Sequence, residues 1–591
     1  MKKYNKELNF FVIISILAIV FRLFISANSP YAVTPQHFYD HGLLVKYAIN
    51  MSEGKWLGGY NCVTLSKGIG FSVLLFISNV LNIPYSILFG LFIVFSCLLF
   101  IFAIKPFVKN YYALSVIFVF MLFCPVSFSY KFGMGVYRNA VVPWTVLGYV
   151  SGILGIYLWT INKNDNYKKL IFWSVITAVY LSYFWILRED SVWLLPFAFA
   201  SSLVIIIMAI MQRKEKGNKR SIVIILAILL QLLLCICTNV FISYMNYKQY
   251  GIFTTNDRTG TYFADVLSDL HHIDAGEQSD DVWISRKQLD IAFKESETLM
   301  SVHDSVVYLW NNWAGGEENE LPGDIGQWAL RDGVSYAGYY DDMAVETNEL
   351  YHQIHNELQE AFKTGKIKEK KGIYLSSQAR AFRIGDFFEC FKISLNVWKN
   401  IRKYEYCNMQ EYIIPMGTNL ENVIEWENFL RMYGVKEEAY MSQMNVNEIY
   451  INQNRIERYN QARVTFLSNI ITKIYKLISY VLAPLMWLGY IAIFVLMVLD
   501  IKSKRKDAKN FFVWLFLTGI LLCEYVHIYI STLFSRWLDG DKKGNVSDYY
   551  NYAPAGYILI QIAEVGCIFY AAVRLISMFK EKKRNAENEN G

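Results

Sequence analysis

The sequence predicts a mainly α-helical membrane protein with about 10–11 transmembrane helices and an α-rich extracytoplasmic domain. Of its 591 residues, 54% are hydrophobic and 16% are aromatic. The apolar residues gather in blocks of about 18–25 residues, which as helices span the roughly 30 Å of bilayer hydrocarbon. Between residues 245 and 475 these blocks stop. Together, these features predict a polytopic protein interrupted by one large domain outside the hydrocarbon.

Ten of the apolar blocks have the length and composition of membrane spans. We expect these spans at residues 9–26, 85–104, 111–128, 140–160, 169–187, 192–211, 221–244, 476–499, 511–534 and 553–579. An additional apolar segment, residues 69–82, is short and ends at Asn82-Ile-Pro84. Because an eleventh crossing would break the alternation of the later loops, we expect this segment to insert only partly or to re-enter on the same side.

Basic residues mark one side of the membrane. They recur in every second loop and at the C-terminal end, at Lys105, Lys109, Lys163, Lys168, Arg213, Lys219, Lys502 and Lys580. Because cytoplasmic loops are enriched in lysine and arginine, this pattern predicts cytoplasmic N and C termini and an extracytoplasmic large domain. The net charge of +6 resides largely in these loops, so we expect membrane lipid and no nucleic acid as a partner. The Asn/Lys/Ile/Tyr-rich composition is typical of a bacterial plasma-membrane protein.

These features divide the chain into three parts. Residues 1–245 form an N-terminal transmembrane module with an outer loop at 27–68, and residues 476–591 form a C-terminal module of three helices. Residues 246–475 form the extracytoplasmic domain between them. Within that domain, apolar residues recur at three- and four-residue spacing from Ala344 to Lys363, which predicts an amphipathic helix.

Three groups of polar residues fall on the outer face of this topology. The first outer loop contains His37-Phe-Tyr-Asp40-His41 and, further on, Lys67. The next contains Lys131, Tyr137 and Arg138, and the third is the short turn Arg188-Glu189-Asp190. Charges this close to hydrocarbon are costly unless they pair or face an aqueous cleft. We therefore expect the three groups to converge on one site.

The residue types in these groups suit proton transfer and phosphate binding. A carboxylate such as Asp40 can accept a proton, and the guanidinium groups of Arg138 and Arg188 can hold a phosphate. Simpler interpretations remain open at this point. Asp40 can be a solvated or helix-capping carboxylate, the arginines can extend to lipid headgroups, and the acidic residues of the third turn can serve only to neutralise Arg188.

One further pair lies inside a predicted span. Glu524 and His527 are one helical turn apart and share a helix face, which makes them an intramembrane functional candidate or a hydrogen-bonding contact between helices. The nine cysteines form no Cys-x-x-Cys motif and no cluster with histidine. The sequence therefore predicts neither a metal site nor a disulfide framework.

The outer-face motifs resemble the GT-C superfamily of polytopic glycosyltransferases, in particular the protein mannosyltransferase and aminoarabinose transferase group. These enzymes carry an acidic residue in the first outer loop, as Asp40 is here, and a basic-acidic turn before a Leu-Leu-Pro span. Leu187-Arg-Glu-Asp-Ser-Val-Trp-Leu-Leu-Pro196 is similar to that turn. The resemblance covers about residues 1–245. This chain departs from the pattern in having a single acidic residue in the loop and Glu189 at the usual proline position.

The resemblance implies transfer of a sugar from a polyprenyl-phosphate donor to an extracytoplasmic glycan, lipid or protein acceptor. Asp40 would deprotonate the acceptor, while Arg138, Arg188 and Lys131 would bind the donor phosphate. Supporting roles fall to four residues, His37, His41, Glu189 and Asp190. No cofactor is required beyond the lipid-linked sugar, although a divalent cation remains an alternative.

Three other functions remain open on the sequence alone. A transporter or flippase of lipid-linked saccharides would use intramembrane groups such as Glu524 as a coupling path, yet the chain shows no repeated halves. A glycan polymerase or ligase would also use outer arginines. A non-enzymatic scaffold predicts that Asp40 and Arg188 lie far apart.

Overall fold

The structure is a computed structural model. It describes residues 2–31, 39–341, 343–410, 425–426, 428–432, 455–502, 508–539 and 548–589. His37 lies outside these residues. The described part of the chain is built from helices, with only isolated β-bridges and no named strand. Ten of its helices are long and apolar enough to cross a membrane. The predicted α-helical polytopic fold is therefore confirmed.

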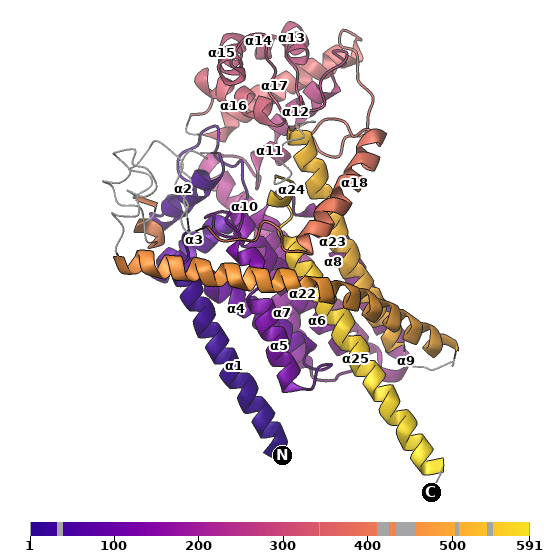
Figure 1. The fold of residues 1–591 in the computed structure, drawn as a ribbon. Coiled ribbons are helices and arrows are strands. Elements are labelled where there is room, and N and C mark those ends of the chain that lie inside the picture. Colours follow the sequence, from indigo (N-terminus) through magenta and orange to yellow (C-terminus); the bar gives the residue numbers. More distant parts are fainter. Residues whose placement is uncertain are drawn as a thin grey trace.

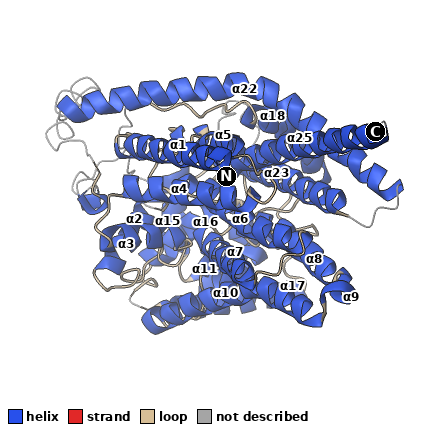
Figure 2. Ribbon diagram, turned by 90° about the horizontal axis from the view of Figure 1, so that it is seen from below, coloured by secondary structure: helices blue, strands red, loops and turns tan. Residues whose placement is uncertain are grey.

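The ten spanning helices form one bundle. They are α1 (Lys2–Ala27), α4 (Tyr85–Ile104), α5 (Tyr111–Leu122, continued to Phe128 by a 3-10 turn), α6 (Val142–Ile161), α7 (Tyr167–Leu187), α8 (Leu195–Met211), α10 (Asn218–Tyr250), α22 (Arg455–Lys502), α23 (Lys509–Asp539) and α25 (Ala555–Glu589). Every residue of α6 is buried, so this helix is the centre of the bundle. Seen along the bundle, α22 lies along one edge and α10 along the opposite edge (Figure 2).

A separate group of helices caps one end of the bundle. It comprises α11 (Asp257–Gly260), α12 (Tyr262–His272), α13 (Arg286–Glu295), α14 (Glu297–Met300), α15 (His303–Ala314), α16 (Ile325–Tyr336) and α17 (Ala344–Lys363). Both chain termini lie at the other end of the bundle (Figure 1). We call the end that carries these helices the capped end. Helix α17 has the bounds that the spacing of its apolar residues predicts, and Leu350, Ile354 and Leu358 are buried.

Two short helices between α1 and α4 lie beside the capped end. They are α2 (His41–Ser52) and α3 (Gly70–Val80). The 11 residues of α3 extend about 17 Å, which is too short to cross the hydrocarbon. Gly68 and Gly70 let this part of the chain touch the end of α7. A Cβ at position 68 would lie 2.6 Å from the Ile186 carbonyl oxygen, and one at position 70 would lie 2.8 Å from the Leu187 Cα, so a larger residue would clash.

The region between the two transmembrane modules is continuous with them. The expected boundary at 245 falls inside α10, and the one at 475 falls inside the 48-residue helix α22. Helix α18 (Ile384–Ile401) leaves the capping helices and packs along the outer part of α23. The expected extracytoplasmic domain therefore includes one helix that packs directly on the bundle.

Candidate active site

Asp40 lies at the capped end of the bundle, at the start of α2. The Lys67 ammonium is 2.8 Å from its Oδ1, and the Tyr137 hydroxyl donates a hydrogen bond of 3.1 Å to the same oxygen. Lys67 is almost buried, whereas the Asp40 side chain keeps 41% of its exposure. The carboxylate is thus held from one side and open on the other.

The surroundings of Asp40 keep it ionised. Burial alone would raise the pKa of its carboxyl, but the ion pair and hydrogen bond with Lys67 lower it, and Arg138 and His41 lower it further. The net result is a pKa well below the ordinary range for aspartate. Asp40 is therefore a carboxylate at any physiological pH.

Arg138 connects Asp40 to the third turn. It begins a 3-10 turn before α6, and its Nε donates to the Tyr137 hydroxyl at 3.1 Å. Its Nη1 donates to both carboxylate oxygens of Glu189, at 2.9 and 2.6 Å. The Gly68 backbone N–H donates to Glu189 as well. Burial would raise the pKa of Glu189, but Arg138, Lys67 and the backbone N–H of Gly68 together outweigh it, so the pKa is lowered.

Arg188 forms the third ion pair. It follows α7 in extended conformation, and Asp190 precedes the 3-10 turn that leads into α8. Two parallel hydrogen bonds join Arg188 to Asp190, at 2.6 and 2.7 Å, and Nη1 of Arg188 donates to Asn139. Despite its burial, Asp190 has a lowered pKa because of this arginine. The Tyr552 ring lies 5.7 Å from the guanidinium carbon.

These side chains form one connected set, which we call the outer-end cluster: Asp40, Lys67, Arg138, Arg188, Glu189 and Asp190. Each of its cations pairs with one of its carboxylates, so their formal charges cancel. Hydrogen bonds through Tyr137 join the first pair to the second, and the adjacent residues Arg138 and Asn139 join the second to the third. The three polar groups predicted from separate outer loops therefore converge.

The capping helices hold the loop that carries Asp40. The Trp328 ring lies 5.5 Å from the Lys67 ammonium and 4.9 Å from the Tyr39 ring. Tyr39 donates a hydrogen bond to Asp332, and the buried Arg331 donates to the Cys62 carbonyl oxygen at 2.7 Å. These contacts hold the loop on the side of the capping helices, while the ends of α6 and α7 hold it on the side of the bundle.

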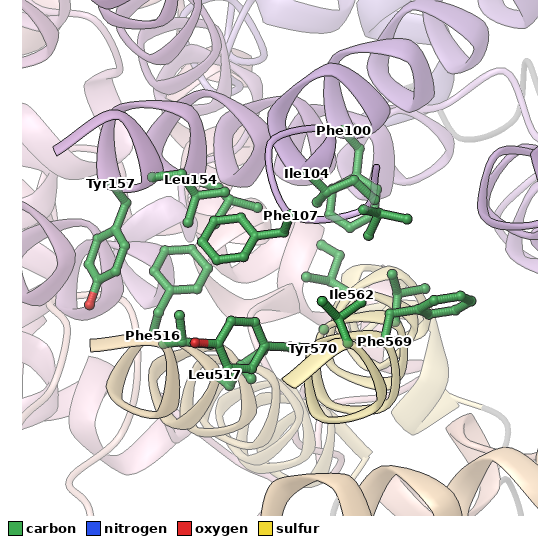
Figure 3. Close-up of a pocket in the computed structure, with 16 residues that line it drawn as sticks. Phe100, Ile104, Phe107, Leu154, Tyr157, Phe516, Leu517, Ile562, Phe569 and Tyr570 are labelled. Atoms are coloured by element: carbon green, nitrogen blue, oxygen red, sulfur yellow. The ribbon is translucent and has the colours of Figure 1, made fainter. Parts of the chain in front are cut away.

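A pocket of about 840 Å³, counted with its open mouth, adjoins the cluster. Arg188 and Glu189 line it together with Asn239 of α10 and Asn256 and Thr259 of the capping region. A second pocket lies between α4, α6, α23 and α25 (Figure 3). The side chains that line this second pocket are apolar or tyrosine, so it offers no charged group for chemistry.

Of the other residues predicted for the site, His41 lies beside the outer-end cluster and Lys131 takes no part in its ion pairs. His41 stacks on Tyr137 with ring centroids 4.4 Å apart, beside Asp40. The Lys131 ammonium lies 5.6 Å from the Tyr406 ring, whereas the cluster's ion pairs come from Lys67, Arg138 and Arg188. His37 lies outside the described residues.

The intramembrane pair separates into two environments. His527 stacks on Trp193, with centroids 3.8 Å apart, and lies within electrostatic reach of Asp190. Glu524 instead accepts a hydrogen bond of 2.7 Å from the indole of Trp398. Glu524 lies within electrostatic reach of Arg402 and Glu564, and we call these three residues the bundle cluster.

Sequence reasoning gave no role in the site to four contributors, although Lys67 and Tyr137 stand in the outer polar groups. They are Lys67, Tyr137, Asn139 and Tyr552. Lys67 is followed by Gly-Ile-Gly, and those glycines, which permit close approach to α7, are the available signal. Among the described residues, no three His, Cys, Asp or Glu side chains gather in a way that could hold a metal ion.

Comparison with protein-family models, with curated proteins and with solved structures finds no match to the chain.

Proposed function

We propose that the protein is a membrane glycosyltransferase that moves a sugar from a polyprenyl-phosphate donor to an extracytoplasmic acceptor. The observation that carries the proposal is the convergence of Asp40, Arg138 and Arg188 at one end of the bundle, in ion pairs linked by hydrogen bonds. A scaffold would not require these residues to meet.

The proposed reaction uses Asp40 as the proton acceptor. The acceptor oxygen forms a bond to the anomeric carbon of the sugar, and the bond from that carbon to the phosphate oxygen breaks. The electron pair of that bond moves to the phosphate, and the proton of the acceptor hydroxyl passes to Asp40. The open side of this carboxylate supports the assignment, since an acceptor must approach it.

Arg138 and Arg188 would stabilise the charge that develops on the departing lipid phosphate. Nη2 of Arg138 makes no hydrogen bond to a residue that the structure describes, so one edge of its guanidinium is free to bind phosphate. Arg188 donates from all three of its nitrogens and lines the adjoining pocket. Phosphate binding at Arg188 therefore requires an exchange with Asp190, whose side chain is 45% exposed.

The proposal includes an orientation in the plasma membrane. The helices α12–α17 and the two termini lie at opposite ends of the spanning bundle (Figure 1). Together with the basic loops, this arrangement supports cytoplasmic termini and an outer-end cluster on the extracytoplasmic side.

A donor-consumption assay tests the function. Purified wild type, Asp40→Asn and Glu53→Gln are incubated with a panel of radiolabelled polyprenyl-phosphate sugars. Glu53 is a matched control, since it follows the last residue of α2 in the same loop, and its ion pair among the described residues is with the exposed Lys55. We expect Asp40→Asn to lose about 10²–10⁴ in rate, the usual contribution of a positioned base, and Glu53→Gln to keep wild-type rates.

Two outcomes would contradict the proposal. Equal turnover by Asp40→Asn and wild type would refute Asp40 as the base. Failure of wild type to consume any donor of the panel, with the protein folded, would refute the transfer of sugars from these lipids.

A further inference from the structure

Helix α18 has an apolar face that no described residue covers. Its exposed apolar residues are Ile384, Phe387, Phe388, Phe391 and Leu395, each with 40% to 77% of its surface accessible. Their spacing of three and four residues places them on a single stripe of the helix. Water-exposed stripes of this kind are rare on soluble domains and mark interaction surfaces.

Helix α17 gives the internal comparison. It belongs to the same expected extracytoplasmic domain, and its apolar residues Leu350, Ile354 and Leu358 are buried against neighbouring helices. Helix α18 also has a buried face, which contains Cys390, Ser394 and Val397. Its aromatic stripe is therefore a second face, distinct from the one that holds the helix to the protein.

The buried face attaches α18 to the outer part of a membrane span. Ser394 and Tyr525 of α23 share a hydrogen bond of 2.9 Å between their hydroxyls, and the Tyr529 hydroxyl donates to the Phe387 carbonyl oxygen at 3.3 Å. At its C-terminal end, Trp398 reaches Glu524, which lies within the spanning part of α23. Helix α18 thus runs along α23 down to the level of intramembrane residues (Figure 1).

The stripe is continuous with exposed apolar surfaces of two spanning helices. Phe391 lies 6.0 Å from the ring of Tyr525 on α23, and Trp398 lies 6.3 Å from Trp487 on α22, between ring centroids. Trp487 is 37% exposed, and nearby Leu488 and Leu522 on the same two spans are about 60% exposed. One apolar surface therefore extends from the two spans onto α18.

We propose that the aromatic stripe of α18 lies in the bilayer, in contact with the lipid that surrounds α22 and α23. The polar edge of the helix fits this placement, because Glu389, Lys392, Asn396 and Lys399 are exposed beside the stripe and can reach the headgroup level. The partner is the lipid surface itself.

This placement connects the lipid surface to the outer-end cluster. Asn400 at the end of α18 donates a hydrogen bond of 2.8 Å to the Tyr550 hydroxyl. The next residue, Asn551, accepts from Asn139, and the Tyr552 ring lies against Arg188. If the proposed transferase function holds, α18 marks a flank on which lipid adjoins the site. The placement in lipid does not depend on that function.

Site-specific photo-crosslinking in native membranes tests the placement without any assay of activity. A photo-reactive amino acid replaces Phe388 in the full-length protein, and lipid adducts are detected by mass spectrometry. Phe199 on the spanning helix α8, 73% exposed, is the positive control, and Tyr336 on α16, 69% exposed, is the negative control. Asn396 on the polar edge is the control within α18.

We expect position 388 to yield phospholipid adducts at a level comparable to position 199, with few or none at positions 336 and 396. Adducts at position 388 no more abundant than at 336 would overturn the proposal, because the stripe would then face water. An adduct with another protein in place of lipid would overturn it as well. Because each replaced residue is exposed, misfolding is not expected, and the lipid adduct at position 199 verifies the membrane-inserted fold.

Discussion

The two clusters of charged side chains differ in how their charges are balanced. In the outer-end cluster every cation has its own carboxylate within 2.8 Å, and two of those carboxylates keep more than 40% of their exposure. In the bundle cluster Glu524 and Glu564 lie within electrostatic reach of the single guanidinium of Arg402. One oxygen of Glu524, one oxygen of Glu564 and two nitrogens of Arg402 have no hydrogen-bond partner among the described residues.

The difference shows where chemistry can occur. Paired charges beside an open pocket can exchange a partner for a ligand. While no ligand is bound, the pairing offsets the free-energy cost of removing these charges from water. Unpartnered polar atoms inside the bundle instead need water or a shared proton, since a buried polar group without a hydrogen bond is costly. The proposed transfer reaction therefore fits the outer-end cluster, and we expect the bundle cluster to serve contact between helices.

The largest expected effect comes from breaking one outer pair. Arg138→Met leaves the Glu189 carboxylate without its cation, and removal of one partner of a buried pair typically costs about 3–5 kcal/mol. Thermal unfolding in detergent should show this loss. The double variant Arg138→Met/Glu189→Met should recover most of the stability while transfer stays lost. Unchanged stability in the single variant would contradict the pairing.

A smaller effect is expected from Lys67, which sets the charge state of Asp40. In Lys67→Met the effect of burial is no longer opposed by the ammonium, so the pKa of Asp40 rises. Because the proposed base must be a carboxylate, activity should be lost on acidification at a pH about 1–3 units higher than in wild type, the usual effect of losing one adjacent opposite charge. The pH dependence of kcat/KM measures this shift.

The sign of this shift also applies to stability. A carboxyl whose pKa is lower in the folded than in the unfolded protein stabilises the fold above its unfolded pKa, and this contribution disappears as the pH falls through the folded pKa. Loss of Lys67 brings the folded pKa of Asp40 closer to its unfolded value, so this contribution is smaller, and the stability of Lys67→Met should fall less steeply on acidification than that of wild type. An acidic limb at the same pH in Lys67→Met and wild type would show that this lysine does not control Asp40.

The smallest expected effect on stability comes from Glu564 in the bundle cluster. In Glu564→Gln the amide retains a hydrogen-bonding group and the bundle cluster keeps one carboxylate for Arg402. We expect the stability to change by no more than about 1 kcal/mol, the net contribution of one ordinary hydrogen bond. A loss as large as that of Arg138→Met, measured in the same unfolding experiment, would show that the bundle cluster is an obligate set of ion pairs.

The spans could be predicted from the sequence because hydrocarbon requires long apolar runs. The ends of the helices that contain these spans could not be predicted in the same way. The span expected from residue 476 lies inside the helix α22, which extends from Arg455 to Lys502. The earlier turns of this helix bury polar residues against the protein and expose Phe466 and Ile470. A hydropathy average along the sequence combines the polar and the apolar face of these turns, so it does not show the apolar face.

The candidate site shows the same division. Asp40, Arg138 and Arg188 could be predicted because charges in short outer turns are anomalous next to hydrocarbon. The pairing of Lys67 with Asp40 and the position of Tyr552 beside Arg188 could not be predicted, because only the packing of loops that are distant in sequence produces these contacts. Helix α18 was not separable from the outer domain, because an amphipathic pattern does not distinguish a face that packs on protein from one that contacts lipid.

A double-mutant cycle on transfer rate tests most directly whether the outer-end cluster acts as one site. It combines Asp40→Asn with Arg138→Lys, which keeps the positive charge beside Glu189 but removes the Nε–H that binds Tyr137. Because Tyr137 joins both residues, we predict that the two losses do not multiply and that the coupling is about 0.5–3 kcal/mol. Losses that simply multiply in the double variant would contradict the account and show that Asp40 and Arg138 act independently.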